Sequence, residues 1–333
     1  MAGASGYAGT ELLRLCAAHP DIEVAVATAH ARAGERVADH TPALAAAYPS
    51  LVYAKPEASA FEDLDVVFLC LPHGESQRLV PELAHPSRVV VDLAADFRLT
   101  DPAAYATWYG EEHVAPQLLG SFVYGLPELH RSQLPGARMV AAPGCYPTAA
   151  ALALAPFTGR GLVDPAGVVV DAASGVSGAG RAAIDRLHFG AVDEDFVAYG
   201  LLTHRHTPEM EQVLGVPVLF TPHLAPMARG ILATCYARPA RRLTTEDAMD
   251  VLHEVYDPEP FVVVRDEPPS TKATSGSNSA HVTACVDERT GWLVALCAID
   301  NLGKGAAGQA LQCANLALGL PETTGLPVAG VYP

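Results

Sequence analysis

Residues 3–15 read GASGYAGTELLRL, with glycines at positions 3, 6 and 9 directly before an apolar helical stretch. This spacing fits the G-x-x-G-x-x-G loop that brings a backbone close to a pyrophosphate at the amino terminus of a helix. Alone, such a loop is weak evidence, because many tight turns before helices are rich in glycine. Its context strengthens it, since a helix follows directly and the β-branched run IEVAVAT at 22–28 is typical of a strand. The amino-terminal part is therefore predicted to bind a dinucleotide.

The alternation of strands and helices continues beyond this segment. A buried strand is predicted at 65–71, a helix at 76–84 and a further strand at 88–93, which favours a doubly wound parallel sheet. After position 150 strands dominate, including a hairpin that turns at 288–291, and a helix closes the chain. We predict an α/β protein with a Rossmann-type NADP-binding domain and an α+β catalytic domain with a mixed or antiparallel sheet. The expected boundaries are 1–143 plus 304–333 for the first domain and 144–303 for the second.

The strand that should precede the glycine loop is missing from the pattern. A dinucleotide-binding fold needs a strand there, and only Met1 and Ala2 come before Gly3. Either residues upstream of Met1 supply the strand, or the strand is absent and the cofactor site is weakened. Because the remaining pattern is intact, we expect a start further upstream.

The residues after the strand at 22–28 bear on the choice between NAD and NADP. NAD-specific sites place an Asp or Glu there, which binds the ribose 2′-hydroxyl. Here the first carboxylate is Glu35, and Arg32 precedes it. An arginine suits a 2′-phosphate, so NADP(H) is the predicted cofactor, although Arg32 is almost equally well explained as a solvated loop residue.

Cys145 is the candidate nucleophile. APGCYPTA at 142–149 places it after a strand and at the start of a helix, with Pro147 in the first turn. The positive end of the helix dipole favours the thiolate, which is the reactive form. The other six cysteines are interpreted as buried, reduced thiols.

HRHTPE at 204–209 supplies a proton partner for this thiol. His204 and His206 flank Arg205 just before a helix, and spacing alone does not choose between the two histidines. His223 is a weaker rival. The H-x-H pair lacks accompanying ligands at a usual metal spacing, so no metal site is predicted.

Composition narrows the class of protein. The formal net charge of −16 over 333 residues argues against nucleic acid and anionic membranes as partners. No apolar run approaches the ~20 residues that span a bilayer, and the seven cysteines form no C-x-x-C pair. We expect a cytoplasmic protein that acts on a small molecule.

Nine strings, in this order, carry a resemblance to a known family. They are GASGYAGTELLRL, LPHG, DLAADFRL, YGLPEL, PGCYPTA, ASGVSGAGR, HRHTPEMEQ, FTPHLAPMARGILAT and IDNLGKGAAGQA. Together they resemble the N-acetyl-γ-glutamyl-phosphate reductases of arginine biosynthesis, almost from end to end. The resemblance implies a closing helix that packs on the Rossmann domain and a homo-oligomer, either a dimer or a tetramer.

The resemblance also implies roles for individual residues. Cys145 would be the nucleophile and His204 the base, with His206 as the alternate for the base and as a substrate contact. The implied NADP(H) contacts are Gly3, Ser5, Gly6, Tyr7, Ala8, Gly9, Arg32, Pro72, Ser174, Gly175 and Asn301. Arg98 and Arg205 are predicted to meet the substrate's phosphate or carboxylate, whereas Arg181 is better explained by a structural ion pair.

The implied reaction reduces N-acetyl-γ-glutamyl phosphate to N-acetylglutamate 5-semialdehyde and phosphate through a cysteine thioester. The rival hypotheses are an aspartate-semialdehyde dehydrogenase, an enzyme that acts on a carrier-protein-linked substrate, a non-catalytic NADP-binding regulator, and a cofactor-free thiol hydrolase or acyltransferase. HRHTPE and PGCYPT speak against the first, and the net charge of −16 speaks against an acidic carrier. The intact Cys145, His204 and Asn301 positions weaken the regulator hypothesis.

Overall fold

The computed structural model describes residues 1–332 and divides into two compact units. The first unit holds residues 1–143 and 306–326, and the second holds residues 144–305 and the chain from Pro327 onward. The closing segment differs from expectation, because it belongs to the second unit: the Asn278 N–H donates to the Pro327 carbonyl at 2.8 Å and the Val331 N–H to the Ser275 carbonyl at 2.7 Å. Residue 333, part of the predicted first domain, lies outside the described residues.

The first unit is built on parallel strands. These are β1 (Ala27–Thr28), β2 (Tyr53–Ala54), β3 (Val66–Leu69), β4 (Val89–Asp92), β5 (Val123–Tyr124) and β6 (Met139–Ala141). The pair β1-β2 and the sheet β3-β4-β6-β5 are linked through Ala2, which forms a parallel bridge with Leu69. Because the Thr28 N–H donates to the Met1 carbonyl at 2.9 Å, Met1 and Ala2 occupy the place between β1 and β3. The resulting order is that of a doubly wound dinucleotide-binding sheet, as predicted.

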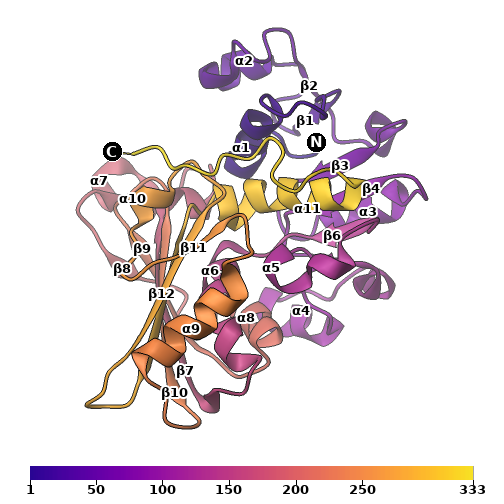
Figure 1. Cartoon of the computed structure of the whole chain (residues 1–333). Coiled ribbons are helices and arrows are strands. Elements are labelled where there is room, and N and C mark those ends of the chain that lie inside the picture. The colour runs from indigo at the N-terminus through magenta and orange to yellow at the C-terminus, as the bar shows by residue number, and fades with distance from the viewer. Residues whose placement is uncertain (333) are drawn as a thin grey trace. The chain divides into compact units, whose positions relative to one another are not determined.

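Helices accompany this sheet. They are α1 (Tyr7–Cys16), α2 (Val37–His40), α3 (Ser76–Leu83), α4 (Pro102–Tyr109), α5 (Pro127–His130) and α11 (Gly308–Leu318). The closing helix α11 packs on α1 and β4 (Figure 1), as the resemblance implied. The buried core beside the sheet includes Phe61, Leu69, Leu83 and Val90.

The strand predicted at 22–28 is wrong over most of its length. Only β1 pairs, and within residues 1–332 the backbone of residues 22–25 forms no hydrogen bond. The reason is the lack of a neighbour: Met1 reaches only as far as Val26, whose carbonyl accepts from the Met1 amino group at 2.8 Å. A cavity of about 600 Å³, lined by residues 21–26 and 63–66, lies where a longer strand would pair with both neighbours.

The second unit contains a seven-stranded mixed sheet. Its strands are β7 (Val163–Gly175), β8 (Val197–Ala198), β9 (Leu219–Ala225), β10 (Ile231–Pro239), β11 (Val262–Val264), β12 (Ala280–Val286) and β13 (Leu293–Ile299). They lie in the order β11-β12-β13-β10-β7-β9-β8. The predicted hairpin is confirmed, since β12 and β13 pair antiparallel from Ala280↔Ile299 to Val286↔Leu293.

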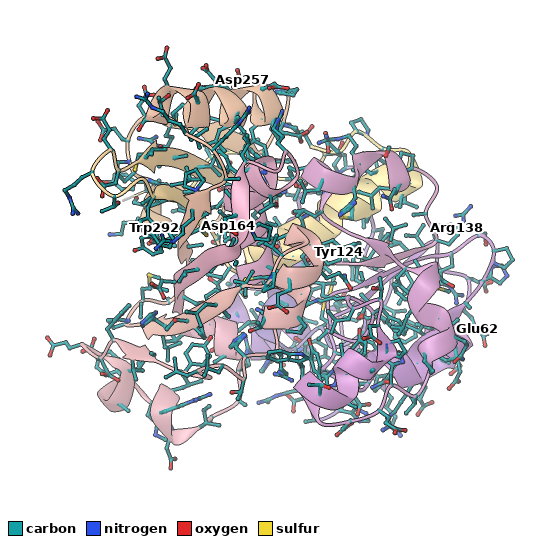
Figure 2. All side chains as sticks on the ribbon, turned by 90° about the horizontal axis from the view of Figure 1, so that it is seen from below. Glu62, Tyr124, Arg138, Asp164, Asp257 and Trp292 are labelled. Atoms are coloured by element: carbon teal, nitrogen blue, oxygen red, sulfur yellow. The ribbon has the colours of Figure 1, made fainter. Side chains whose placement is uncertain are left out.

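Helices accompany this sheet. They are α6 (Cys145–Thr158), α7 (Phe189–Val192), α8 (Thr207–Leu214), α9 (Thr245–Tyr256) and α10 (Thr271–Thr274). The almost wholly buried α6 packs on β10 and β13, and α9 packs on β11 and β12 (Figure 1). In Figure 2, Asp257 marks the carboxyl end of α9 and Trp292 the start of β13. Among residues 1–332, no helix is long and apolar enough to cross a bilayer.

Candidate active site

Cys145 is the first residue of α6. The helix begins there because Gly144 takes extended N-cap angles (φ −67°, ψ 154°), and the Thr148 hydroxyl donates to the Gly144 carbonyl at 2.9 Å. The α6 helix has 14 residues and no acidic side chain in its first turn. The positive end of its dipole acts on the Cys145 thiol, which favours the thiolate.

Two glycines make room around this cysteine. A Cβ on Gly144 would lie 2.6 Å from Nε2 of His206, so the imidazole packs directly on the residue before the nucleophile. A Cβ on Gly305 would lie 2.9 Å from the Cys145 Cβ. Neither position accepts a side chain without moving His206 or Cys145.

A cluster of aromatic rings surrounds the two histidines. The ring centroids of His204 and His206 are 4.9 Å apart, and Tyr146 lies 5.6 Å from the first and 5.9 Å from the second. The Tyr199 hydroxyl donates to the Tyr146 hydroxyl at 3.1 Å, which in turn donates to the His223 carbonyl at 3.1 Å. Burial raises the pKa of Tyr199 to about 12 and raises that of Tyr146 as well, so both stay protonated at neutral pH.

His204 is held as a neutral imidazole. Its Nδ1 accepts the backbone N–H of His206 at 3.1 Å, which places the ring proton on Nε2. Burial, with a contribution from the Arg205 charge, lowers the pKa of His204 to about 4. The side chain is therefore a hydrogen-bond donor through Nε2 at neutral pH.

A cavity of about 510 Å³ joins these groups within the second unit. Its wall includes Cys145, Tyr146, Ser174, Arg186, Asp195, Tyr199, His204, Arg205 and His206. The predicted nucleophile, both candidate bases, Ser174 and Arg205 thus share one space. His223 is not among the lining residues; its ring stacks on Phe196 at 5.1 Å.

Glu209 supports the turn before Cys145. Its carboxylate is fully buried and accepts the Gly144 N–H at 2.8 Å. The contact joins the first turns of α6 and α8. Neither Glu209 nor Tyr199 was predicted as a site residue. Glu209 nevertheless stands three residues after His206, at the spacing that places two side chains on one helical face.

The glycine loop of the first unit has the geometry that a pyrophosphate needs. Gly3 has φ +74°, and a Cβ there would collide with the Cys70 carbonyl; a Cβ on Gly9 would lie 2.6 Å from the Gly3 carbonyl oxygen. The α1 helix follows with Gly6 as N-cap, no capping side chain and no acidic residue in its first turn. Since the first turn of a helix leaves N–H groups without intrahelical partners, these residues fit an anionic dinucleotide. Ser5, Tyr7 and Ala8 lie in this loop and first turn.

The remaining predicted cofactor contacts lie in both units. In the first, Arg32 forms an exposed ion pair with Glu35 at 3.0 Å, and Pro72 follows β3 on the surface. Surface pairs of this kind are worth only about 0–1 kcal/mol, so Arg32 can exchange Glu35 for a phosphate. In the second unit, Ser174 and Gly175 end β7, and the Asn301 amide joins the Ser177 hydroxyl (2.9 Å) to the Gly230 N–H (2.8 Å).

Arg98 has a structural environment in the first unit. It is buried, its Nε donates to the Ala142 carbonyl and its Nη2 to the Leu93 carbonyl, both at 2.8 Å. These bonds tie together the ends of β4 and β6, and a substrate contact for Arg98 stays a prediction. Among residues 1–332, no three ligand-type side chains converge as a metal site would require.

Comparison with known proteins identifies the family. Residues 1–137 match the family described as "Semialdehyde dehydrogenase, NAD binding domain", and residues 145–301 match "Semialdehyde dehydrogenase, dimerisation domain". Proteins named N-acetyl-gamma-glutamyl-phosphate reductase match over the whole chain: that of Symbiobacterium thermophilum is 50% identical over 100% of this chain and 98% of its own length. That of Salinispora arenicola is 52% identical over 99% and 98%.

Solved structures agree on the fold. Aspartate semialdehyde dehydrogenase II of Vibrio cholerae, complexed with ASA, has a TM-score of 0.70 at 16% identity and covers 95% of this chain and 96% of its own. The Candida albicans enzyme with NADP has a TM-score of 0.68 at 17% identity, over 94% and 96%. With both domain families matched in order and reductases about half identical over their full length, this chain belongs to the semialdehyde dehydrogenase family and, within it, to the N-acetyl-gamma-glutamyl-phosphate reductases.

Proposed function

We propose that this chain uses NADPH to reduce N-acetyl-γ-glutamyl phosphate to N-acetylglutamate 5-semialdehyde, with release of phosphate. The name shared by relatives at 44% to 52% identity supports the substrate. The observation that carries the chemistry is the cavity that holds a helix-terminal thiol, Cys145, beside two imidazoles. A thiolate next to proton-handling groups is what covalent capture of an acyl group requires.

The reaction divides at a thioester. The Cys145 sulfur attacks the γ-acyl carbon, an S–C bond forms, and the bond to phosphate breaks as phosphate leaves with its electron pair. NADPH, when bound, supplies the hydride that reduces the thioester carbon. The C–S bond of the resulting thiohemiacetal then breaks, the thiolate leaves, and the aldehyde is released.

The two histidines divide the proton chemistry. Because Nδ1 of His204 accepts a backbone N–H and its pKa is about 4, the ring has no free lone pair for a thiol proton. It suits the task of donating Nε2–H to the acyl oxygen as negative charge develops there. His206 packs against Gly144, and this position supports His206, the alternate from the sequence, as the base that takes the Cys145 proton.

NADP(H) would be held by the residues that the family resemblance implies. The loop at Gly3, Gly6 and Gly9, with Ser5, Tyr7 and Ala8, would hold the pyrophosphate at the start of α1. Arg32 would meet the 2′-phosphate, and Pro72 would border the loop after β3. Ser174, Gly175 and Asn301 would border the nicotinamide.

We propose a homo-oligomer assembled through the open face of the second unit's sheet. While α6 and α9 cover one face, Val169, Tyr236, Val294 and Trp292 line a shallow apolar groove on the sheet. Exposed apolar patches of this kind mark contact surfaces, and a second copy offers a matching one. Light scattering should give a dimer or tetramer that Val294→Asp converts to monomer; a monomeric wild type would contradict the proposal.

We also place the protein in the cytoplasm, where its seven thiols would remain reduced.

The test of function is phosphate-dependent reduction of NADP⁺ by N-acetylglutamate semialdehyde, followed by absorbance. The wild type should turn over, and Cys145→Ser should lose at least ~1,000-fold in kcat. Cys285→Ser, at an exposed cysteine on β12, is the matched control and should retain full activity. Aspartate semialdehyde should react far more slowly. Absence of turnover from folded wild-type protein would refute the assignment.

A further inference from the structure

One wall of the active-site cavity carries an arginine that sequence analysis did not single out. Arg186 lies on the segment between β7 and β8, lines the cavity and is exposed. Its guanidinium carbon is 6.0 Å from the centre of the Tyr199 ring. The ring thus holds the positive charge at a defined place on the wall, since an aromatic face attracts a cation at this range.

Arg186 differs from the other cations considered for the substrate. Within residues 1–332 the Arg186 side chain forms no ion pair and no hydrogen bond, and it contacts the Tyr199 ring. Arg98 is bonded to backbone carbonyls of the first unit, and the charge of Arg205 acts on His204. Asp195 also lines the cavity but does not pair with Arg186. Arg186 is therefore a cavity cation whose carboxylate partner is not supplied by the protein.

Its position relative to Cys145 follows from a short chain of contacts. Tyr146 follows Cys145 in the chain, and the Tyr146 hydroxyl accepts a hydrogen bond from the Tyr199 hydroxyl at 3.1 Å. The Arg186 guanidinium in turn lies over the Tyr199 ring. The nucleophile and the guanidinium thus line the same cavity of about 510 Å³ and are linked through the Tyr146–Tyr199 pair. An acyl group attached to Cys145 would lie in this cavity, where Arg186 offers a cation to a carboxylate.

We infer that Arg186, positioned by Tyr199, is the subsite for the α-carboxylate of an N-acylated amino-acid substrate. The inference rests on the proposed function, because it assumes an acyl group on Cys145. A guanidinium binds a carboxylate through two parallel hydrogen bonds. The subsite selects substrates that carry a carboxylate at the end opposite the reacting carbon.

The experiment compares two aldehydes in the phosphate- and NADP⁺-dependent assay. N-acetylglutamate semialdehyde carries the α-carboxylate, and 4-acetamidobutanal is the same molecule without it. Wild type should prefer the first in kcat/KM by about 10–100-fold, the usual effect of a hydrogen bond to a charged group. Arg186→Gln should raise KM for the semialdehyde by that factor, leave 4-acetamidobutanal unchanged, and so remove the preference. Arg186→Lys, which keeps the charge, should restore part of it.

Control variants distinguish failure of the Arg186 subsite from failure of the proposed function. Arg289→Gln, on the exposed β12–β13 hairpin, should behave as wild type with both aldehydes. An unchanged preference in Arg186→Gln, or an equal loss with both aldehydes, would overturn the subsite while wild-type activity still stood. An inactive wild type would instead overturn the proposed function. Circular dichroism confirms folding, and Arg186→Lys carries the test if the glutamine variant does not fold.

Discussion

Replacement of Glu209 tests how the turn before the nucleophile is held. The buried carboxylate accepts the Gly144 N–H at 2.8 Å, so Glu209→Ala leaves that donor without its partner. A hydrogen bond to a charged group contributes about 1.5–3 kcal/mol, and an unsatisfied buried donor costs about 1–3 kcal/mol. The two ranges describe partly the same loss and do not add in full. We therefore expect the free energy of unfolding to fall by about 3 kcal/mol. Glu209→Gln keeps a carbonyl acceptor and should lose only about 1 kcal/mol.

Urea unfolding followed by circular dichroism measures these differences. Glu254→Ala is the control: this glutamate of α9 is 71% exposed and pairs with Arg160, so its loss should cost less than about 1 kcal/mol. The rate at which iodoacetamide alkylates Cys145 should change in Glu209→Ala, because the α6 turn is no longer held, and stay near wild type in the control. If Glu209→Gln costs as much as Glu209→Ala, the acceptor at Gly144 is not the reason for the loss, and the argument fails.

Three further predictions follow from the site and the sheet. Gly144→Ala should abolish turnover, because the added Cβ would lie 2.6 Å from Nε2 of His206. Gly190→Ala is the control and should stay active, since there is open space around Gly190. Equal turnover in the two variants would contradict the packing of His206 on Gly144. The His204 imidazole should titrate near pH 4 when it is followed by NMR. As the pH falls, the unfolded chain protonates His204 before the folded chain does, so the contribution of neutral His204 to stability should be complete above pH ~6.5 and decline below it. A titration midpoint near 6.5 would refute the effect of burial. Burial raises the pKa of Asp92 to about 7, so the folded chain keeps a proton that the unfolded chain releases, and stability should fall between pH 3.8 and about 7. Asp92→Asn should remove that fall in urea titrations, and an unchanged pH profile would show that Asp92 is not its source.

The parts of the fold that were predictable are those with local signals. The glycine loop, the buried run in β3 and the hairpin of β12 and β13 each carry a periodicity or a turn that needs no distant partner. The segment 22–28 has an equally strong strand composition, yet it pairs only at Ala27 and Thr28. A strand exists only where a neighbour supplies hydrogen bonds, and composition does not report the neighbour.

The site divides in the same way. Cys145 was found because a glycine, a cysteine and a proline at the start of a helix form a local pattern. Arg186, Tyr199 and Glu209 belong to the site through tertiary contacts with the α6 turn and the cavity wall. Nothing in their immediate sequence distinguishes them from surface residues or ordinary core residues.

The stretch beside β3 makes amide exchange a direct report on what lies between β1 and β3. Within residues 1–332 the amides of residues 22–25 have no backbone acceptor and border the cavity of about 600 Å³. If that place stays open, these amides should exchange with solvent as fast as those of a loop, whereas pairing with a further stretch of chain would protect them as in a strand. A dinucleotide bound at the glycine loop would stabilise the first unit by mass action, so its addition should slow amide exchange throughout that unit.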